Sequence, residues 1–271
     1  MKTAVQHIYR PPHDDDGLLY AWFLSMHTRV DILLCSRKSE EELLSVVERA
    51  RNALSSLEKI ANYYDPASEL AVVNRTASVS PVILSSELYA MIDLCLEYHK
   101  KTLGCFDVTV HSENYNQDTI HSVYLSAEER SIFYRQPGVT INLSGFLKGY
   151  ALETIRELLN SCSIENALIN MGNSSLLALG NHPAGTGWKV NDVHLYNECL
   201  TTSGNESNER QHIISPQTAS FVEGIKQITV VTKSGAIGEI LSTSLFAANP
   251  KQRDILLTNF RPLLINYFHN L

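Results

Sequence analysis

The amino-acid sequence predicts an α+β fold. Segments typical of strands and segments typical of helices alternate along the chain without the regular spacing of a βαβ repeat, which argues against a doubly wound parallel sheet. Of the 271 residues, 44% are hydrophobic and 19% are charged, a composition that suits a globular protein with a large buried core. We find no internal repeat and no low-complexity segment in the sequence.

The first sixty residues are predicted to form two strands and a long helix. Residues 18–23 and 29–35 are rich in apolar, aromatic and β-branched side chains, and a short turn separates them. Ser39 and Glu42 then have the spacing of a capping box, and apolar residues recur at helical spacing as far as Ile60. This pattern indicates an amphipathic helix with one buried face.

The middle of the chain is predicted to contain a second helix, a loop and two strands. Turn residues end the first helix, and apolar residues at helical spacing mark the next one from about 86 to 101. Residues 111–121 are polar and are expected to form a loop. Apolar runs at 132–134 and 139–143 are typical of strands, and a third helix is expected to start near Lys148.

The last hundred residues are predicted to continue this mixture. Glycine and asparagine separate several apolar runs, each of which has the length of a strand. The expected strands are residues 167–170, 175–178, 188–190, 200–203, 228–232 and 263–268. Two more helices are expected at about 238–248 and 251–257.

Charge, hydropathy and cysteine spacing exclude several classes of protein. The formal net charge is −7 and no Lys- or Arg-rich run occurs, so nucleic acid is not an expected partner. No apolar stretch approaches the roughly 20 residues that cross a bilayer, so no transmembrane segment is expected. The 5 cysteines never form a CxxC pair, which argues against a zinc site and against a disulfide framework.

The N-terminal region is expected to be an extension without an export signal. Residues 1–17 contain two prolines and three consecutive aspartates, but no apolar run of about 7 to 15 residues like that of a signal peptide. We expect a poorly ordered extension at 1–17, a single domain at 18–271 that two closely packed lobes could also form, and a cytoplasmic location. An exported or periplasmic lipoprotein whose leader had been removed would have the same start.

Lys148 lies in the first segment that could carry chemistry. A predicted strand passes through Ser144 and Gly145 into the helix that begins near this lysine. Free N–H groups and the positive dipole end of such a helix favour an anion, and Lys148 adds a charge suited to phosphate. The same strand, turn and helix are common without a ligand, and Lys148 could equally be a solvated side chain.

A second segment combines hydroxyls with a histidine. Thr202 and Ser203 at a strand end could hold a phosphate or a ribose, and His212 in the turn-rich loop that follows could act as a base near neutral pH. The alternative is a polar hairpin with a surface histidine.

A third segment offers ligands for a hard cation. Glu239 and Thr243 are four residues apart on one helical face, and both carry the oxygen ligands that Mg²⁺ prefers. Alternatively, Glu239 favours the helix dipole and Thr243 bonds back to the helix carbonyls. Two smaller groups, Ser68 with Glu69 and Asp107 with Thr109, could contact a ligand or could serve only as turn hydrogen bonds.

Taken in order, these segments resemble the FAD:protein FMN transferase (ApbE) family from Met26 to about Phe246. The matching motifs are Met26-His27-Thr28, Asp65-Pro66-x-Ser68-Glu69-Leu70, Gly104-x-Phe106-Asp107-x-Thr109-Val110, Asn142-Leu143-x-Gly145-x-x-Lys148-Gly149-Tyr150-Ala151, Ala167-Leu168-Ile169-Asn170-Met171-Gly172, Thr202-Ser203-Gly204, His212-Ile213-Ile214-x-Pro216-x-Thr218 and Leu241-Ser242-Thr243-x-Leu245-Phe246. Each motif is short, and their common order carries the resemblance.

The resemblance implies a T-fold-like α+β architecture with mixed or antiparallel sheets and packed helices. It also implies an enzyme that binds FAD, uses Mg²⁺ and transfers FMN to a threonine hydroxyl of an acceptor protein, releasing AMP. His212 would be the catalytic base. The metal would be held by Glu239, Thr243 and the backbone carbonyl of Leu147. FAD would be contacted by Ser68, Glu69, Asp107, Lys148, Gly172, Thr202 and Ser203.

Several residues depart from the usual family pattern, and they leave the activity open. These residues are Asn142, Ser144, Asn173, Ser215, Gln217 and Glu239. Asn142 and Ser215 stand where the family has a carboxylate, Gln217 where it has arginine, and Glu239 where it has the shorter aspartate. Transfer of FMN is the favoured interpretation. The alternatives are a member that binds FAD or a nucleotide without transfer, and a pyrophosphatase that hydrolyses FAD to FMN and AMP.

Overall fold

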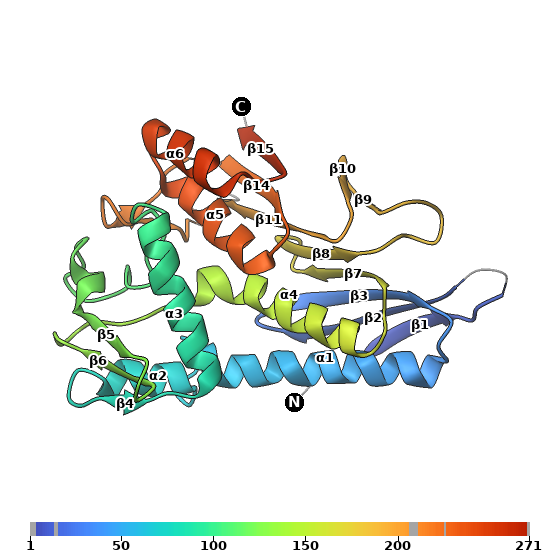
Figure 1. Ribbon diagram of the computed structural model, residues 1–271, viewed down its shortest axis with the longest axis horizontal. Coiled ribbons are helices and arrows are strands. Elements are labelled where there is room, and N and C mark those ends of the chain that lie inside the picture. Colours follow the sequence, from blue (N-terminus) through green and yellow to red (C-terminus); the bar gives the residue numbers. More distant parts are fainter. Residues whose placement is uncertain (1–3, 14–15, 206–210, 225, 270–271) are drawn as a thin grey trace. The chain divides into compact units, whose positions relative to one another are not determined.

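The computed structural model describes residues 4–13, 16–205, 211–224 and 226–269 (Figure 1). The chain divides into two compact units, which are described separately below. Unit 1 comprises Met1–Ser56, Lys148–Thr202 and Val230–Glu239, and unit 2 comprises Leu57–Leu147, Ser203–Thr229 and Ile240–Leu271. None of the helices in the described part of the chain is long and apolar enough to span a membrane.

Helices and strands alternate as the sequence predicts. The helices are α1 (Glu40–Ala61), α2 (Glu69–Thr76), α3 (Ser86–Lys101), the short 3₁₀ helix η1 (Thr119–Ser122), α4 (Ser144–Ser161), α5 (Gly235–Ala247) and α6 (Pro250–Phe260). The strands are β1 (Gln6–Arg10), β2 (Gly17–Ser25), β3 (Thr28–Ser36), β4 (Val82–Ile83), β5 (Val123–Ser126), β6 (Ser131–Tyr134), β7 (Asn166–Met171), β8 (Ser175–Leu179), β9 (Trp188–Val190), β10 (Val193–Leu195), β11 (Glu198–Gly204), β12 (Ile214–Ser215), β13 (Ser220–Phe221), β14 (Lys226–Thr232) and β15 (Leu264–His269).

An eight-stranded sheet has the strand order β1-β2-β3-β7-β8-β11-β14-β15. Its strands from β1 to β11 pair antiparallel with their neighbours. Alternate residues of β2, such as Leu19 and Ala21, are fully buried, as are Ile32 of β3 and Ile169 of β7. Ile32 pairs with both Ala21 and Ile169 in register, so these side chains line one buried face of the sheet.

The opposite face of this sheet is partly covered by the hairpin of β9 and β10. Trp188 and Leu195 of the hairpin are buried in one apolar cluster with Leu176 and Leu200. The indole N–H of Trp188 donates to the carbonyl oxygen of Leu179 at 2.7 Å, which satisfies its buried polar group. Unit 1 therefore has a core on both sides of its central strands.

Residues 6–10 form a strand, although the sequence predicts a poorly ordered extension over residues 1–17. β1 pairs antiparallel with β2, with Gln6 opposite Trp22 and Arg10 opposite Leu18. All its residues except Tyr9 are exposed, so the segment lacks the apolar alternation that identifies a strand in sequence. Backbone pairing to β2 holds this edge strand, and pairing partners are not visible in sequence.

The long helix α1 begins with the predicted capping box. The Glu42 N–H donates to the Ser39 hydroxyl at 3.3 Å, and the Ser39 N–H donates to the Glu42 carboxylate at 2.8 Å. Its buried side chains Leu43, Val47 and Leu54 recur at helical spacing. The prediction for this helix is confirmed.

In unit 2, α2 lies where the sequence predicts turn residues and no helix. Ser68 is its N-cap: the hydroxyl accepts from the N–H of Ala71 at 3.1 Å and donates to the carbonyl of Asn62 at 2.6 Å. The turn residues before Ser68 therefore lead directly into a helix. The adjacent α3 agrees with its predicted bounds and is capped in the same way by Ser85, whose hydroxyl accepts from the N–H of Leu88 at 3.1 Å.

Residues 139–143 do not form the strand that their apolar sequence predicts. The side chain of Asn74 replaces a neighbouring strand: its amide donates to the carbonyl of Ile141 at 2.8 Å, and its oxygen accepts from the N–H of Ile141 at 2.9 Å. The next residue, Asn142, accepts from the N–H of Ser144 at 2.9 Å. An amide side chain therefore holds this segment in front of α4.

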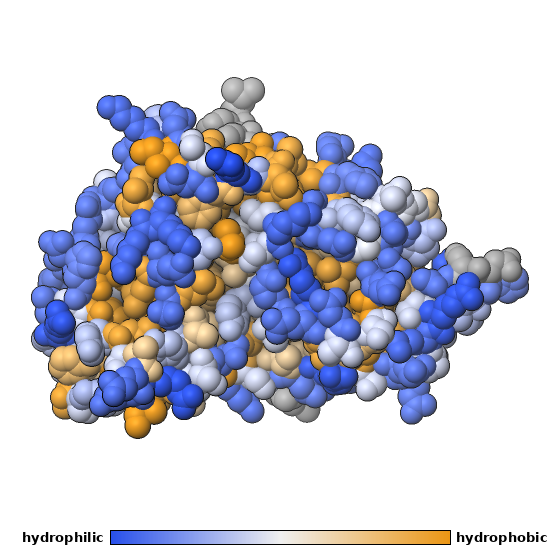
Figure 2. Space-filling model, in the orientation of Figure 1, coloured by the Kyte–Doolittle hydropathy of each residue, from blue (hydrophilic) through white to orange (hydrophobic). Residues whose placement is uncertain are grey.

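Hydrophilic residues cover much of the face shown in Figure 2, with hydrophobic residues in patches between them. The most exposed large apolar side chains of unit 2 are Val79 and Ile83, at 84% and 74% exposure, which lie just before and within the two-residue strand β4. Exposed apolar residues of this kind are common on globular proteins and do not by themselves mark a binding site.

Candidate functional site

Within unit 1, α4 and α5 approach each other so closely that only glycine fits at their contact. A Cβ atom on Gly149 would lie 2.2 Å from the carbonyl oxygen of Gly235 and 2.6 Å from Cγ of Glu239. Real Cβ atoms do not approach other heavy atoms at such distances, so Gly149 is required there. This contact places the residue after Lys148 directly against Glu239.

A chain of hydrogen bonds links Lys148 to Glu239 through two serines. The Lys148 ammonium donates to the Ser174 hydroxyl, and the Ser174 and Ser175 hydroxyl oxygens are 3.3 Å apart. The Ser175 hydroxyl in turn donates to Oε1 of Glu239. We call these four residues the lysine–glutamate chain. Lys148 and Glu239 are site residues predicted from the sequence, whereas neither serine is predicted from the sequence to have a site role.

Glu239 is a buried carboxyl group, with 5% of its surface exposed. Burial raises its pKa above the ordinary value, and the charge of Lys148 and the hydrogen bond from Ser175 only partly oppose this. The carboxylate form is therefore costly in unit 1 without a further positive charge. A bound cation would supply that charge.

The neighbouring residues of β11 are also packed against the start of α5. A Cβ on Gly238 would lie 2.7 Å from Oγ1 of Thr201 and 2.8 Å from Oγ1 of Thr232. The N–H of Thr202 donates to the carbonyl of Ser174 at 2.7 Å, which joins β11 to the lysine–glutamate chain. Through Ser174, the backbone of Thr202 is therefore joined to the residues that link Lys148 and Glu239, and the role of Thr202 in a common site stays a prediction.

In unit 2, hydroxyl groups gather where β11 meets α5. The Ser203 hydroxyl lies 2.8 Å from that of Ser242 and 3.1 Å from that of Thr243. Thr243 is one helical turn after Glu239 on the same helix. Ser203 and Thr243, predicted separately as a FAD contact and a metal ligand, are therefore hydrogen-bonded neighbours.

The predicted magnesium ligands are one carboxylate and neutral oxygens. Among the residues that the structure describes, no group of three or more His, Cys, Asp or Glu side chains could hold a metal ion. The carboxylate of Glu239, the hydroxyl of Thr243 and the carbonyl of Leu147 are hard oxygen donors of the kind that Mg²⁺ selects. The buried Glu239 carboxylate fits such an ion, because a cation would offset its desolvation.

His212 is exposed and lies two residues before β12. The next residue, Ile213, is buried, and its carbonyl accepts from the N–H of Val222 at 2.8 Å. The hairpin of β12 and β13 therefore begins directly after the histidine. An exposed imidazole with its backbone fixed on one side can accept a proton from a molecule that approaches from solvent.

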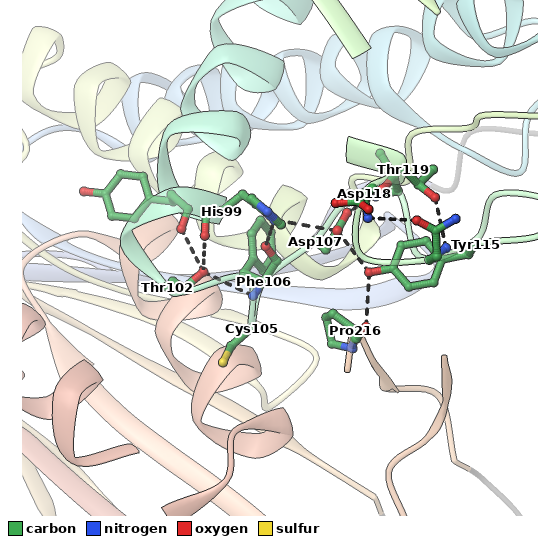
Figure 3. Close-up of polar contacts among 12 residues, drawn as sticks. His99, Thr102, Cys105, Phe106, Asp107, Tyr115, Asp118, Thr119 and Pro216 are labelled. Atoms are coloured by element: carbon green, nitrogen blue, oxygen red, sulfur yellow. Dashed lines mark hydrogen bonds and ion pairs between the residues drawn. The ribbon is translucent and has the colours of Figure 1, made fainter. Parts of the chain in front are cut away.

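Asp107 is buried in a hydrogen-bonded cluster of unit 2 (Figure 3). Its Oδ1 accepts from the N–H and the hydroxyl of Thr109, at 2.7 and 2.6 Å. Its Oδ2 accepts from the Tyr115 hydroxyl at 3.1 Å and lies 3.6 Å from Nδ1 of His99. Both carboxylate oxygens are thus used inside unit 2, and the expected contact of Asp107 with FAD stays a prediction.

Ser68 and Glu69 also make contacts within unit 2. Ser68 is fully buried as the N-cap of α2. Glu69 accepts from the N–H of Ser85 at 2.7 Å, so its carboxylate joins the starts of α2 and α3. Their predicted contacts with FAD remain predictions. The hydrogen bonds that they make in the structure stabilise the starts of α2 and α3.

Gly172 lies in the turn between β7 and β8. Its φ of +65° belongs to the left-handed region, and a Cβ there would lie 2.2 Å from Oγ1 of Thr28. Thr28 belongs to the first matching motif, so the two motifs meet in unit 1. The departure at Asn173 fits this turn, because asparagine tolerates its φ of +62° and its N–H donates to the side chain of Asn170 at 2.9 Å.

The ApbE family model matches residues 26–264, which is most of the chain. The FAD:protein FMN transferase of Chlamydia pneumoniae is 24% identical over 258 residues, covering 81% of this chain and 82% of that protein. The protein of the same name from Haemophilus influenzae is 22% identical over 263 residues, covering 79% of this chain and 74% of its own.

Solved structures share the fold of the chain. The flavinyl transferase ApbE of Pseudomonas stutzeri, in its apo form, superposes with a TM-score of 0.79 at 17% identity, covering 93% of this chain and 90% of that one. The flavin transferase ApbE of Vibrio cholerae gives a TM-score of 0.74 at 17% identity, covering 94% of this chain and 91% of that one. The predicted α+β architecture is confirmed.

Proposed function

Because the chain belongs to the ApbE family, we propose that it transfers FMN from FAD to a threonine hydroxyl of an acceptor protein, with release of AMP and with the help of Mg²⁺. The chain is a transferase of this family, and proteins of the family named FAD:protein FMN transferase match it over most of their length. The observation that carries the proposal is the lysine–glutamate chain of unit 1, which joins a cation suited to phosphate to a buried carboxylate.

The proposed reaction breaks the phosphoanhydride bond of FAD. The acceptor hydroxyl oxygen attacks the FMN phosphorus, its proton passes to a base, and AMP leaves with the bridging oxygen. Such a transfer requires charge neutralisation on the phosphates, a positioned base and alignment of the reacting groups. Lys148 lies in the first turns of α4 and could neutralise charge on the phosphates. The N-terminus of a helix itself also favours phosphate.

His212 is the proposed base. The hydroxyl that it would deprotonate belongs to another protein, so the base must be reachable from outside. The exposure of His212 meets this need, and imidazole is the side chain most often used for proton transfer near neutral pH.

Mg²⁺ would be held by Glu239, Thr243 and the carbonyl of Leu147. When bound there, the ion would supply positive charge for the diphosphate oxygens. Ser175 fixes one oxygen of Glu239 by donating to it, which orients the carboxylate. Lys148, Gly172, Thr202 and Ser203 are the proposed contacts of FAD, and Ser68, Glu69 and Asp107 are proposed as further contacts.

Mass spectrometry of the products tests this function. The purified chain is incubated with FAD and Mg²⁺, with and without an acceptor protein, and a Thr→Val acceptor serves as the matched control. We expect a covalent FMN mass on the acceptor that its Val variant lacks. Free FMN and AMP without labelling would indicate a pyrophosphatase, and bound but unchanged FAD would indicate a binding protein. Absence of FAD binding would contradict all three functions.

A further inference from the structure

The hairpin that follows His212 is too short to be stable on its own. We call residues 212–222 the histidine hairpin; it contains β12, β13 and the turn between them. Its ladder consists of two residue pairs, Ile214 with Phe221 and Ser215 with Ser220. Isolated two-stranded hairpins are marginal even when longer, so the position of this one must depend on contacts with other parts of unit 2.

Tyr115 makes such a contact at the turn of the hairpin (Figure 3). Its phenolic oxygen lies 3.4 Å from the carbonyl oxygen of Pro216 and 3.1 Å from Oδ2 of Asp107, and its proton can be shared between these two acceptors. Pro216 is buried and has no N–H of its own, so the carbonyl is its only backbone hydrogen-bonding group. The tyrosine therefore bridges a buried carboxylate and the hairpin turn.

Two further hydrogen bonds join the same two segments. The amide of Gln117 donates to the carbonyl of Gln217 at 3.4 Å, and the amide of Gln217 donates to Sγ of Cys105 at 3.5 Å. Both are long and weak. They show that residues 105–117 contact the hairpin turn at three points. Of the three contacts, the one made by Tyr115 comes from a side chain that is also hydrogen-bonded to a carboxyl group, that of Asp107.

The support for Tyr115 is rigid. Asp107 is fixed by the two bonds from Thr109, and the His99 ring beside it is held by its contact with the carbonyl of Phe106 at 3.0 Å. Burial and the charge of Asp107 raise the pKa of Tyr115 above its usual range, so the phenol keeps its proton at neutral and moderately alkaline pH. It therefore remains a hydrogen-bond donor over that pH range.

We propose that Tyr115, held by Asp107, is a positioning residue that sets the histidine hairpin and thereby the place of His212. The inference rests on the proposed function, because it assigns His212 the role of base. Pro216 is four residues beyond His212, and the intervening Ile213 and Ser215 are buried, so a shift of the turn is passed to the histidine. A catalytic base must lie within hydrogen-bonding reach of its proton, and a displacement of about 1 Å can cost on the order of 100-fold in rate.

The variant Tyr115→Phe tests the proposal, because it keeps the ring and removes the hydroxyl. We expect kcat for FMN transfer to fall about tenfold with the KM for FAD unchanged, since a small displacement of the base slows the chemical step only. Hydrogen–deuterium exchange of the amides at 212–222 should become faster, and exchange elsewhere should not.

Tyr20→Phe is the matched control. The Tyr20 hydroxyl donates to Oδ1 of Asp31 at 2.6 Å, so this variant also removes a tyrosine–aspartate bond, but in unit 1. It should leave both kcat and the exchange at 212–222 unchanged. Gln117→Ala is a second variant at an exposed residue, where folding is not at risk, and it should speed exchange at the hairpin to a smaller extent.

Unchanged exchange at 212–222 in Tyr115→Phe would overturn the proposal, and so would faster exchange with an unchanged kcat. A rise in the KM for FAD at constant kcat would also overturn it, because it would assign Tyr115 to substrate binding. A wild-type chain that transfers no FMN would refute the proposed function and the catalytic half of this inference. The exchange measurement would still decide whether Tyr115 holds the hairpin.

Discussion

The lysine–glutamate chain and the histidine hairpin are built in opposite ways. The first lies on two helices and a buried strand of unit 1, where Gly149 allows backbone contact and two serines link the charged groups. The second is a short surface hairpin of unit 2, whose histidine is exposed. Side chains from outside the hairpin contact it at Pro216, Gln217 and Val222.

The difference fits two different tasks. Binding of a charged diphosphate needs groups whose positions are fixed before the ligand arrives, and helices and strands provide that precision. Proton transfer from a protein substrate needs a base that solvent-borne molecules can reach, and loops on a rigid scaffold commonly carry such residues. Substitutions should therefore separate binding from turnover according to the region that they affect.

The largest effect is expected for His212→Ala. Removal of a general base typically costs about 10²- to 10⁴-fold in rate, so transfer should almost vanish while FAD binding is retained. Single-turnover labelling of the acceptor, measured at saturating FAD, checks this outcome. A full transfer rate in the variant would show that another group takes the proton.

Glu239→Gln should remove the dependence on Mg²⁺ together with most of the activity. The neutral amide keeps the size of the side chain but loses the charge that holds a cation, and we expect a loss on the order of 100-fold. Transfer rates measured across a magnesium titration give the result. Glu239→Asp is the control, since it keeps the carboxylate. If the transfer rate of Glu239→Gln still depends on Mg²⁺, the metal is not bound by Glu239.

Gly149→Ala should destabilise unit 1, because the added methyl would meet the backbone of Gly235. Overpacking at backbone costs about 3 kcal/mol at such a site. The matched change Gly145→Ala, also on α4, meets nothing within 4 Å and should be neutral or stabilising by up to about 1 kcal/mol. Urea unfolding distinguishes them, and equal midpoints for the two variants would contradict the close helix contact.

The smallest effect concerns the pH dependence of stability. Burial raises the pKa of Glu239 in the folded chain above its ordinary value of 4.5, so the linked stability is present below that pH and is lost as the pH rises through the folded pKa. Without Mg²⁺ and FAD, Glu239→Gln should therefore gain stability relative to the wild type as the pH rises from acid to neutral. If the difference in unfolding free energy between the two proteins does not change with pH, the pKa of Glu239 is not raised by burial.

Elements with strong local patterns could be predicted from the sequence. The capping box and apolar periodicity gave α1, and apolar runs bounded by turn residues gave β2, β3 and β7. Segments whose structure depends on a distant partner could not. β1 is a strand because β2 pairs with it, and residues 139–143 are not a strand because the Asn74 side chain takes the place of one.

The same limit applies to the candidate site. Lys148 and Glu239 are predicted as site residues from their motifs, but the serines that join them come from a third segment, and only the fold brings that segment near. Ser174 and Ser175 are two neighbouring small hydroxyl residues at the start of an otherwise apolar strand, which was the one signal available. Tyr115 lies in a polar loop, and nothing in the sequence links it to Pro216.

The division between binding and proton transfer can be tested most directly by calorimetric titration of FAD, with Mg²⁺, into the wild type, Lys148→Met and His212→Ala. Lys189→Met, which removes an exposed lysine of unit 1, is the control. We expect Lys148→Met to weaken FAD binding by at least about tenfold, as for loss of a hydrogen bond from a charged group, and His212→Ala to bind as the wild type does. Equal weakening in both variants would contradict the division, because it would show that the histidine region also binds FAD.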